Sequence, residues 1–188
     1  MTRLVLLGPP GAGKGTQARR LAERLGVPAI STGDIFRANV SEGTELGREA
    51  QRYMDAGEYV PDSVTNAMVA DRLAEPDAAG GFLLDGYPRT AAQVAELDRM
   101  LAAGGASLDA VVELTADSEE IVARLKNRAE TEGRSDDTES VIRRRLEVYT
   151  EQTAPLTRVY SERGLLVEVD GIGAVEDVTA RILATLGR

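Results

Sequence analysis

Lysine and threonine side chains stand within a glycine-rich run near the start of the chain, Gly8–Thr16, which reads GPPGAGKGT. Glycines let backbone N–H groups approach phosphate oxygens, a lysine in such a loop reaches the outer phosphates, and a following hydroxyl can hold Mg²⁺. The run follows the G-x-x-x-x-G-K pattern, with Lys14 as its lysine and one additional glycine before Thr16. We therefore predict a phosphate-binding loop, against the alternative of a glycine-rich turn that contains an incidental lysine.

The segments on either side of this loop favour the phosphate interpretation. The apolar run Leu4–Leu7 predicts a buried strand, and apolar residues at helical spacing predict a helix over Gly15–Leu25, with Gly26 as its stop. A helix that begins directly after the loop adds the partial positive charge of its N-terminus to the site.

A second group of residues that could bind a metal ion or a phosphate follows another apolar run, Phe82–Leu84. Asp85 ends this predicted strand, where its carboxylate can hold Mg²⁺ directly or through water; the alternative is an Asp-Gly turn. Arg89 follows in the same turn, and a guanidinium matches phosphate geometry with two parallel hydrogen bonds. Thr90 and Gln93 also fit the pattern of a helix capping box, so Gln93 has a structural interpretation beside a binding one.

Arginines gather around a short polar segment, 129–137. Arg124 and Arg128 lie one helical turn apart before it, Arg134 lies within it, and Arg145 follows on the next predicted helix. Any one of these arginines could belong to a solvated helix face. Together, in an acidic chain, they favour a site where cations stabilise the negative charge of phosphoryl transfer.

The composition excludes several other chemistries. The chain has 188 residues, a formal net charge of -9, and neither cysteine nor histidine. Disulfides, thiol catalysis and cysteine-based zinc sites are excluded, and so is the commonest general base. A phosphate acceptor, with a second pKa of about 6, is already ionised and needs no base. The acidic charge argues against nucleic acid or an anionic membrane as partner, and with no apolar run long enough to span a bilayer we expect a cytoplasmic enzyme.

Apolar runs alternate with amphipathic segments along the chain, which predicts an α/β fold with a mostly parallel five-stranded sheet between two helical layers. The predicted strands are Leu4–Leu7, Val27–Ile30, Phe82–Leu84, Ala110–Leu114 and Leu165–Val169. The predicted helices are Gly15–Leu25, Asp34–Val40, Glu45–Ala56, Ser63–Leu73, Ala91–Ala102, Ser118–Arg128, Thr138–Tyr160 and Val175–Leu186. Ligands of such sheets bind beyond the carboxyl ends of the strands, so Lys14, Ser31, Thr32, Asp85 and Asp170 should converge on one cleft.

Two segments interrupt the alternation. Residues 32–60 hold two short predicted helices and no clear strand, which indicates an insertion that covers the cleft. Residues 129–137 form a polar joint that is either a solvated loop or a mobile lid.

These features together resemble the adenylate kinases, which transfer the γ-phosphoryl group of MgATP reversibly to AMP and give two ADP. The resemblance runs over essentially the whole chain. It is carried by Gly8–Thr16, Ser31–Arg37, Met54–Pro61, Gly81–Thr90 with Gln93, Arg124–Arg128, Gly133–Asp137 with Arg145, and Thr153–Pro155.

The resemblance implies a role for each candidate residue. Residues expected to bind ATP are Gly11, Ala12, Gly13, Lys14, Gly15, Thr16, Arg124, Arg128 and Gly173. Residues expected to bind AMP are Thr32, Arg37, Glu58, Tyr59, Val60, Gly86, Arg89, Gln93, Arg134 and Arg145. Those expected to act in catalysis are Lys14, Asp85, Arg89, Arg128, Arg134 and Arg145, with Thr16 and Asp85 holding Mg²⁺ through ATP and water. Asp136 would support the arginines of the lid.

The resemblance also implies an organisation within one P-loop kinase domain, 1–188. The expected parts are a core of 1–31, 61–123 and 138–188, an AMP-binding subdomain of 32–60, and a short lid of 124–137. Many bacterial members carry a long lid with four metal-binding residues. This chain has five residues between Arg128 and Arg134 and no cysteine or histidine, so we expect no zinc. We expect a monomer whose partners are ATP, AMP and ADP.

Three alternatives remain at this point. A UMP/CMP kinase would share the fold, but that family usually has alanine in place of Thr32 and asparagines in place of Thr90 and Gln93. A nucleotide-dependent switch would be supported by an Asn-Lys-x-Asp motif, which the chain lacks. A binding module without catalysis is disfavoured by the intact lysine, aspartate and arginines.

Overall fold

The computed structural model describes residues 1–134 and 137–188, and its centre is a five-stranded sheet. The strands lie in the order β2-β3-β1-β4-β5, and each neighbouring pair is parallel. Their bounds are β1 Thr2–Leu7, β2 Ala29–Ser31, β3 Gly81–Asp85, β4 Ala110–Thr115 and β5 Leu166–Asp170. Central strands of a parallel sheet are covered on both faces, which explains why β1 and β3 are nearly continuous apolar runs. The α/β fold with a parallel five-stranded sheet is confirmed.

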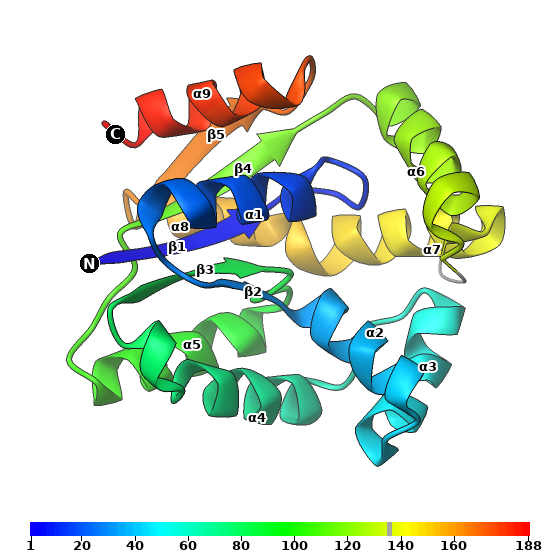
Figure 1. Ribbon diagram of the computed structural model, residues 1–188, viewed down its shortest axis with the longest axis horizontal. Helices are drawn as coiled ribbons and strands as arrows, with labels where there is room; N and C mark the ends of the chain where they lie inside the picture. Colours follow the sequence, from blue (N-terminus) through cyan, green and yellow to red (C-terminus); the bar gives the residue numbers. More distant parts are fainter. Residues whose placement is uncertain (135–136) are drawn as a thin grey trace.

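Helices cover both faces of this sheet (Figure 1). Their bounds are α1 Lys14–Leu25, α2 Thr32–Glu42, α3 Glu45–Ala56, α4 Asp62–Leu73, α5 Ala91–Ala103, α6 Ser118–Glu132, α7 Glu139–Val148, α8 Pro155–Glu162 and α9 Val175–Thr185. Leu4 and Leu6 of β1 face a core formed with α1 and α9. Val5 and Leu7 face the opposite core, formed with α4, α5 and α8. The alternation of β1 side chains therefore joins two hydrophobic layers through one strand.

Two pairs of helices stand beyond the carboxyl ends of the strands, α2 with α3 and α6 with α7 (Figure 1). The first pair confirms the two helices expected between residues 32 and 60. Ser31 ends β2 and caps α2, because its hydroxyl accepts a hydrogen bond from the backbone N–H of Asp34. One residue thus closes a strand and opens a helix at the edge of the sheet where ligands are expected.

Two helix predictions were wrong in their bounds. The helix expected to end at Arg128 continues to Glu132, because Ala129, Glu130 and Glu132 are good helix formers and the left-handed Gly133 provides the stop. The single helix expected over Thr138–Tyr160 is α7, a π-helical turn over Tyr149–Thr153, and α8. Pro155 has no N–H to continue the helical hydrogen-bond ladder. The N–H of Ala154 donates at 2.8 Å to the carbonyl of Tyr149, five residues earlier, which is the π-helical pattern.

The strand β2 begins two residues later than expected, at Ala29 rather than Val27. Pro28 lacks an N–H, so it joins the sheet only through its carbonyl, which accepts from the N–H of Leu83 at 3.0 Å. Within the described residues, no helix combines the length and the apolar character that crossing a membrane requires.

Candidate active site

The glycine-rich loop joins the end of β1 to the start of α1. Gly11 and Gly13 have φ values of 85° and 96°, a region that glycine adopts without steric cost, and Gly13 is the residue that opens the helix. Lys14 is the first helical residue, and its Nζ donates to the carbonyl oxygens of Gly8 at 2.8 Å and Pro9 at 3.1 Å. The lysine is therefore folded back over the loop, with its charge held by neutral acceptors.

Burial and the neighbouring arginines act on the pKa of Lys14 in the same direction. Burial and, to a lesser extent, the positive charges of Arg89, Arg145 and Arg128 lower the pKa of Lys14 to about 8, against the opposing effect of Asp85. A lysine that is surrounded by cations is stabilised when an anion arrives. The loop is thus electrostatically prepared for a ligand with negative charge.

Asp85 lies at the end of β3, beside the first turn of α1. Its Oδ2 is 3.7 Å from the position that a Cβ on Gly15 would occupy, and its carboxylate lines the same cavity as the Thr16 hydroxyl. Burial raises the pKa of Asp85, an effect opposed by Lys14 and Arg89. In the described part of the chain no hydrogen bond reaches this carboxylate, so it does not act as a turn cap. A buried carboxylate that lines one cavity with a hydroxyl is a donor set that suits Mg²⁺.

Gly86 brings three segments together at the edge of the sheet: the end of β3, the start of α2 and the turn of Arg89. Its carbonyl accepts from Thr32 Oγ1 at 2.8 Å and from Arg89 Nε at 2.8 Å. A Cβ at this position would lie 2.8 Å from both the Thr32 hydroxyl and an Arg89 terminal nitrogen, and φ is 82°. Only glycine allows β3, α2 and the Arg89 turn to approach so closely.

Arg89 is oriented entirely by neutral groups in the described structure. Its guanidinium carbon lies 5.2 Å from the centre of the Tyr59 ring, and its carbonyl accepts from Thr153 Oγ1 at 2.7 Å. The Tyr59 hydroxyl is 2.5 Å from the same Thr153 oxygen, so Tyr59 and Thr153 fix the residue from both ends. No carboxylate of the described residues pairs with Arg89, which leaves its charge available for an anionic ligand.

The arginines on the other side of the site are held by carboxylates. Asp137 accepts from Arg128 through two hydrogen bonds of 2.6 Å and from Arg145 at 2.9 Å, and its side chain is 0% exposed. Burial opposes the charged form, but the hydrogen bond and charge of Arg128, with the charge of Arg145, lower the pKa of Asp137 below its usual value. Arg134 pairs with Glu132 at 2.6 Å. This cluster fixes three guanidinium groups at one mouth of the cleft.

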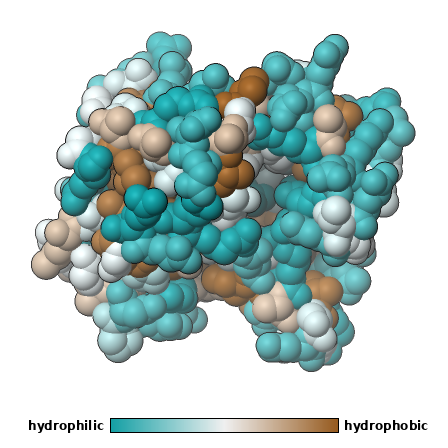
Figure 2. Space-filling model, turned by 45° about the horizontal axis from the view of Figure 1, so that its top comes forward, coloured by the Kyte–Doolittle hydropathy of each residue, from teal (hydrophilic) through white to brown (hydrophobic). Residues whose placement is uncertain are grey.

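Two cavities lie at the carboxyl edge of the sheet, and Figure 2 shows the surface hollowed between two lobes. The first is lined largely by apolar and neutral polar side chains, among them Phe36, Met54, Tyr59, Val60, Thr65 and Gln93. The second is lined by the glycine-rich loop, Asp85 and the arginines of α6 and its neighbours. Both cavities share one wall, and its charged side chains are Lys14, Arg37, Arg89 and Arg145. The geometry therefore offers two ligand sites whose anionic groups would meet between four cations.

Comparison with known proteins agrees with this arrangement. Residues 6–165 match the family model of adenylate kinase. An adenylate kinase of Kocuria rhizophila is 67% identical over 188 residues, which cover the whole of both chains. One from a Nocardioides species is 68% identical over 184 residues, covering 98% of this chain and 96% of that one. One from Thermobifida fusca is 61% identical over 184 residues, covering 98% and 97%. The chain belongs to the adenylate kinase family.

Most residues expected from the adenylate kinase resemblance lie on the two cavities. The first cavity is lined by Thr32, Arg37, Glu58, Tyr59, Val60, Gly86, Arg89, Gln93 and Arg145. The second is lined by Gly11, Gly13, Lys14, Gly15, Thr16, Asp85, Arg124, Arg128 and Arg134. Ser31, at the end of β2, also lines the second cavity as expected.

Three expected residues do not line either cavity. Ala12 is buried in the core, and only its carbonyl faces the site, where it accepts from Arg124 at 3.3 Å. Gly173 lies in the loop after β5, next to Arg181. The expectation that Asp170 joins the cleft was wrong: β5 is the edge strand farthest from β3, and Arg181 donates to the Asp170 carbonyl at 2.6 Å.

Sequence reasoning missed several residues around the site. Asp136, which was expected to support the lid arginines, lies outside the described residues; Asp137, which was not singled out, accepts hydrogen bonds from Arg128 and Arg145. Thr153 belongs to a stretch that carries the resemblance, but nothing in the sequence pointed to its bond with Arg89. Asp62 and Arg144 gave no signal, because their partners Gln93 and Glu58 are distant in the chain.

Proposed function

We propose that this member of the adenylate kinase family transfers the γ-phosphoryl group of MgATP reversibly to AMP and so forms two ADP. The observation that carries the proposal is the wall of Lys14, Arg37, Arg89 and Arg145 shared by the two cavities. Transfer between two nucleotides needs one site for each, arranged so that their phosphates meet. Cations between the sites screen the repulsion of the two anions and stabilise the charge of the transition state.

On the donor side, the glycine-rich loop and the N-terminus of α1 bind the ATP phosphates. When phosphate oxygens arrive, Lys14 exchanges the carbonyls of Gly8 and Pro9 for them. Thr16 and Asp85 would hold Mg²⁺, which would neutralise charge on the outer phosphates. Arg124 bridges the carbonyls of Ala12 and Gly171, at 3.3 and 3.0 Å, so it holds the loop against the segment after β5 on the adenine side.

On the acceptor side, the apolar cavity takes the adenine of AMP and the shared wall takes its phosphate. Arg89 is the strongest phosphate ligand of this side, because its guanidinium is oriented by Gly86 and Tyr59 and has no carboxylate partner within the described residues. Arg37 joins it from α2. Because the attacking oxygen belongs to an ionised phosphate, the reaction needs no general base, which suits a chain without histidine.

We further propose that residues 32–60 act as an AMP-binding subdomain and 124–137 as a short lid, both of which close over the ligands. Closure excludes water, which would otherwise receive the phosphoryl group. Without ligand, the AMP segment is tied to the rest of the site by Glu58, which pairs with Arg144 Nε at 2.5 Å, and by the contact of Tyr59 with Thr153. We expect a cytoplasmic monomer with Mg²⁺ as its only metal.

The proposal is tested by measuring ADP formation from MgATP with AMP, UMP, CMP, GMP or dAMP as acceptor. The control contains no acceptor. Fast ADP formation with AMP, and slow formation with the pyrimidine nucleotides, is the expected result. A preference for UMP or CMP would overturn the assignment of the acceptor, and equal ADP formation without acceptor would overturn transfer between nucleotides.

A further inference from the structure

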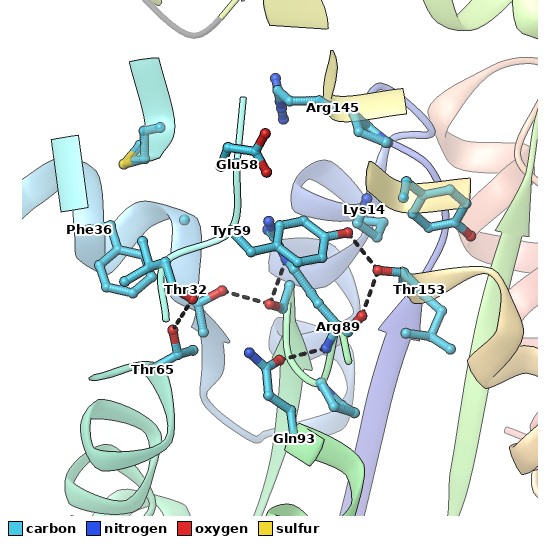
Figure 3. Close-up of a pocket in the computed structure, with 18 of the residues that line it drawn as sticks. Lys14, Thr32, Phe36, Glu58, Tyr59, Thr65, Arg89, Gln93, Arg145 and Thr153 are labelled. Carbon is cyan, nitrogen blue, oxygen red and sulfur yellow. Dashed lines mark hydrogen bonds between the residues drawn. The ribbon is translucent and has the colours of Figure 1, made fainter. Parts of the chain in front are cut away.

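Gln93 presents an amide to the acceptor cavity, and an amide has two faces of opposite polarity. Its Oε1 can accept two hydrogen bonds and its Nε2 can donate two. Oε1 accepts from the backbone N–H of Arg89 at 2.7 Å (Figure 3), and Nε2 donates to Asp62 Oδ1 at 2.8 Å. These bonds use one of the two hydrogen-bonding positions on each amide atom. One acceptor position and one donor position are therefore left for a ligand.

The two protein partners of this amide also determine which way it points. A carboxylate only accepts, and a backbone N–H only donates. If the amide were turned over, Oε1 would face the Asp62 carboxylate and Nε2 would face the Arg89 N–H. Both contacts would then join groups of like polarity at hydrogen-bond distance in a site where Gln93 is 2% exposed. The amide orientation is thus fixed by its surroundings before any ligand binds.

Asp62 is itself held in place. It opens α4, its Oδ1 also accepts from Thr90 Oγ1 at 3.0 Å, and Thr90 is the residue that caps α5. The carboxylate therefore joins the start of α4 to the start of α5 through the Gln93 side chain. Asp62 contacts Gln93 from outside the cavity and does not line it.

A fixed amide can distinguish purines by their 6-position. A 6-aminopurine offers a donor at the 6-position and an acceptor at N1, whereas a 6-oxopurine offers an acceptor and then a donor. An amide that presents Oε1 and Nε2 in a fixed order pairs with only one of these two arrangements. To pair with the other, the amide must turn over against Asp62 and Arg89.

We propose that Asp62 is a specificity-determining positioning residue, which locks the Gln93 amide in the orientation that accepts 6-aminopurine and rejects 6-oxopurine monophosphates. This inference rests on the proposed function, since it concerns the base of the acceptor nucleotide. It assigns the discrimination to a carboxylate outside the cavity rather than to Gln93 alone. Without this carboxylate only the Arg89 N–H opposes the turn, so the amide turns over more readily to suit a 6-oxopurine.

The test compares AMP with IMP, which differs from AMP only by the 6-oxo group and the proton on N1. The variant Asp62→Asn is nearly isosteric, but its side-chain amide can turn either an acceptor or a donor toward Gln93, and the Thr90 hydroxyl can accept as well as donate. We expect the ratio of kcat/KM for AMP to that for IMP to fall about tenfold or more. The KM for MgATP should stay within about twofold, since Asp62 is remote from the donor cavity.

Asp62→Ser provides a second variant, because a serine hydroxyl also offers either polarity and is accepted at a helix start. Asp77→Asn is the matched control: it removes a carboxylate just beyond the other end of α4, where the half-exposed Asp77 pairs with Arg72 at 2.8 Å. The products are separated by chromatography, and the thermal midpoint of each variant is recorded. A purely structural role would lower turnover of AMP and IMP equally and leave their ratio unchanged.

The outcomes separate this inference from the proposed function. If the unmodified protein phosphorylates AMP and rejects IMP, and both Asp62 variants accept IMP much better, the inference is supported. An unchanged ratio of AMP to IMP in both folded variants would overturn the inference and leave the proposed function intact. Failure of the unmodified protein to phosphorylate AMP would overturn the proposed function and this inference with it.

Discussion

Asp137 is the carboxylate on which the arginine cluster depends, so Asp137→Asn is the most informative single change for stability. Its side chain is fully buried and accepts three hydrogen bonds of 2.6, 2.6 and 2.9 Å from Arg128 and Arg145. Removing one partner of a buried ion pair costs about 3–5 kcal/mol. The two arginine side chains are 22% and 19% exposed, which lets water stabilise them in part. We therefore expect a lower value, about 2–3 kcal/mol.

For a chain of this size, a loss of that magnitude lowers the thermal midpoint by about 5–10 °C. The measurement is urea unfolding and thermal unfolding followed by circular dichroism. The control is Asp98→Asn, which removes a carboxylate that pairs with Arg163 at the surface and should lower the free energy of unfolding by less than about 1 kcal/mol. If Asp137→Asn were no more destabilising than this control, the buried cluster would contribute nothing to stability.

The pH dependence of the stability difference between the unmodified protein and Asp137→Asn gives an independent check. The pKa of Asp137 is lowered in the folded protein, so its contribution is fully present above the pKa of an unfolded aspartate, about 4. The contribution is lost as the pH falls through the lower folded value. The stability difference between the unmodified protein and Asp137→Asn should therefore be constant from pH 7 to about 5 and shrink at lower pH. A difference that grows on acidification would refute this assignment of charge.

Three further predictions concern the shared wall and the ties of the AMP segment. Arg89→Ala and Lys14→Met should each lower kcat by about 10²–10³ without changing the circular dichroism spectrum. The control Arg158→Ala, at an exposed position, should leave kcat unchanged. Wild-type rates in the first two variants would refute the roles of Arg89 and Lys14. Binding of MgATP at pH 8 should make the protein take up protons, because the phosphates of the ligand raise the pKa of Lys14 from about 8. Calorimetry in buffers of different ionisation enthalpy should show that this uptake disappears near pH 6.5 and in Lys14→Met. Arg144→Met should lengthen the distance between labels on α3 and α7 without ligand, because the bond to Glu58 is lost; an unchanged distance would show that the pair does not hold the segment.

The parts of this protein that sequence reasoning predicted well are those determined by local pattern. The glycine-rich loop directly follows β1, Asp85 ends β3 and Arg89 lies in the turn after it, so the parallel sheet brings all three to one edge. The short apolar runs were long enough to be recognised, and the predicted cap Thr90 sets the start of α5. The local signals and the fold agree at these positions.

The parts that sequence reasoning missed depend on contacts between distant segments. Asp62 meets Gln93 31 residues away, and Thr153 meets Arg89 64 residues away, and neither pairing leaves a mark on the local pattern. The polar composition of 129–132 suggested a joint, although its residues favour helix and continue α6. The break between α7 and α8 is an exception, because Pro155, which has no N–H to continue the helical ladder, was a local signal for it.

The central claim is that two nucleotides bind at once and exchange a phosphoryl group across the wall of Lys14, Arg37, Arg89 and Arg145. Its most direct test supplies ATP labelled at the γ-phosphate together with unlabelled AMP and Mg²⁺, and follows the label by chromatography and nuclear magnetic resonance. The account predicts that the label appears in the β-phosphate of ADP, with two ADP formed for each AMP consumed. Label released as inorganic phosphate at the same rate with or without AMP would contradict it.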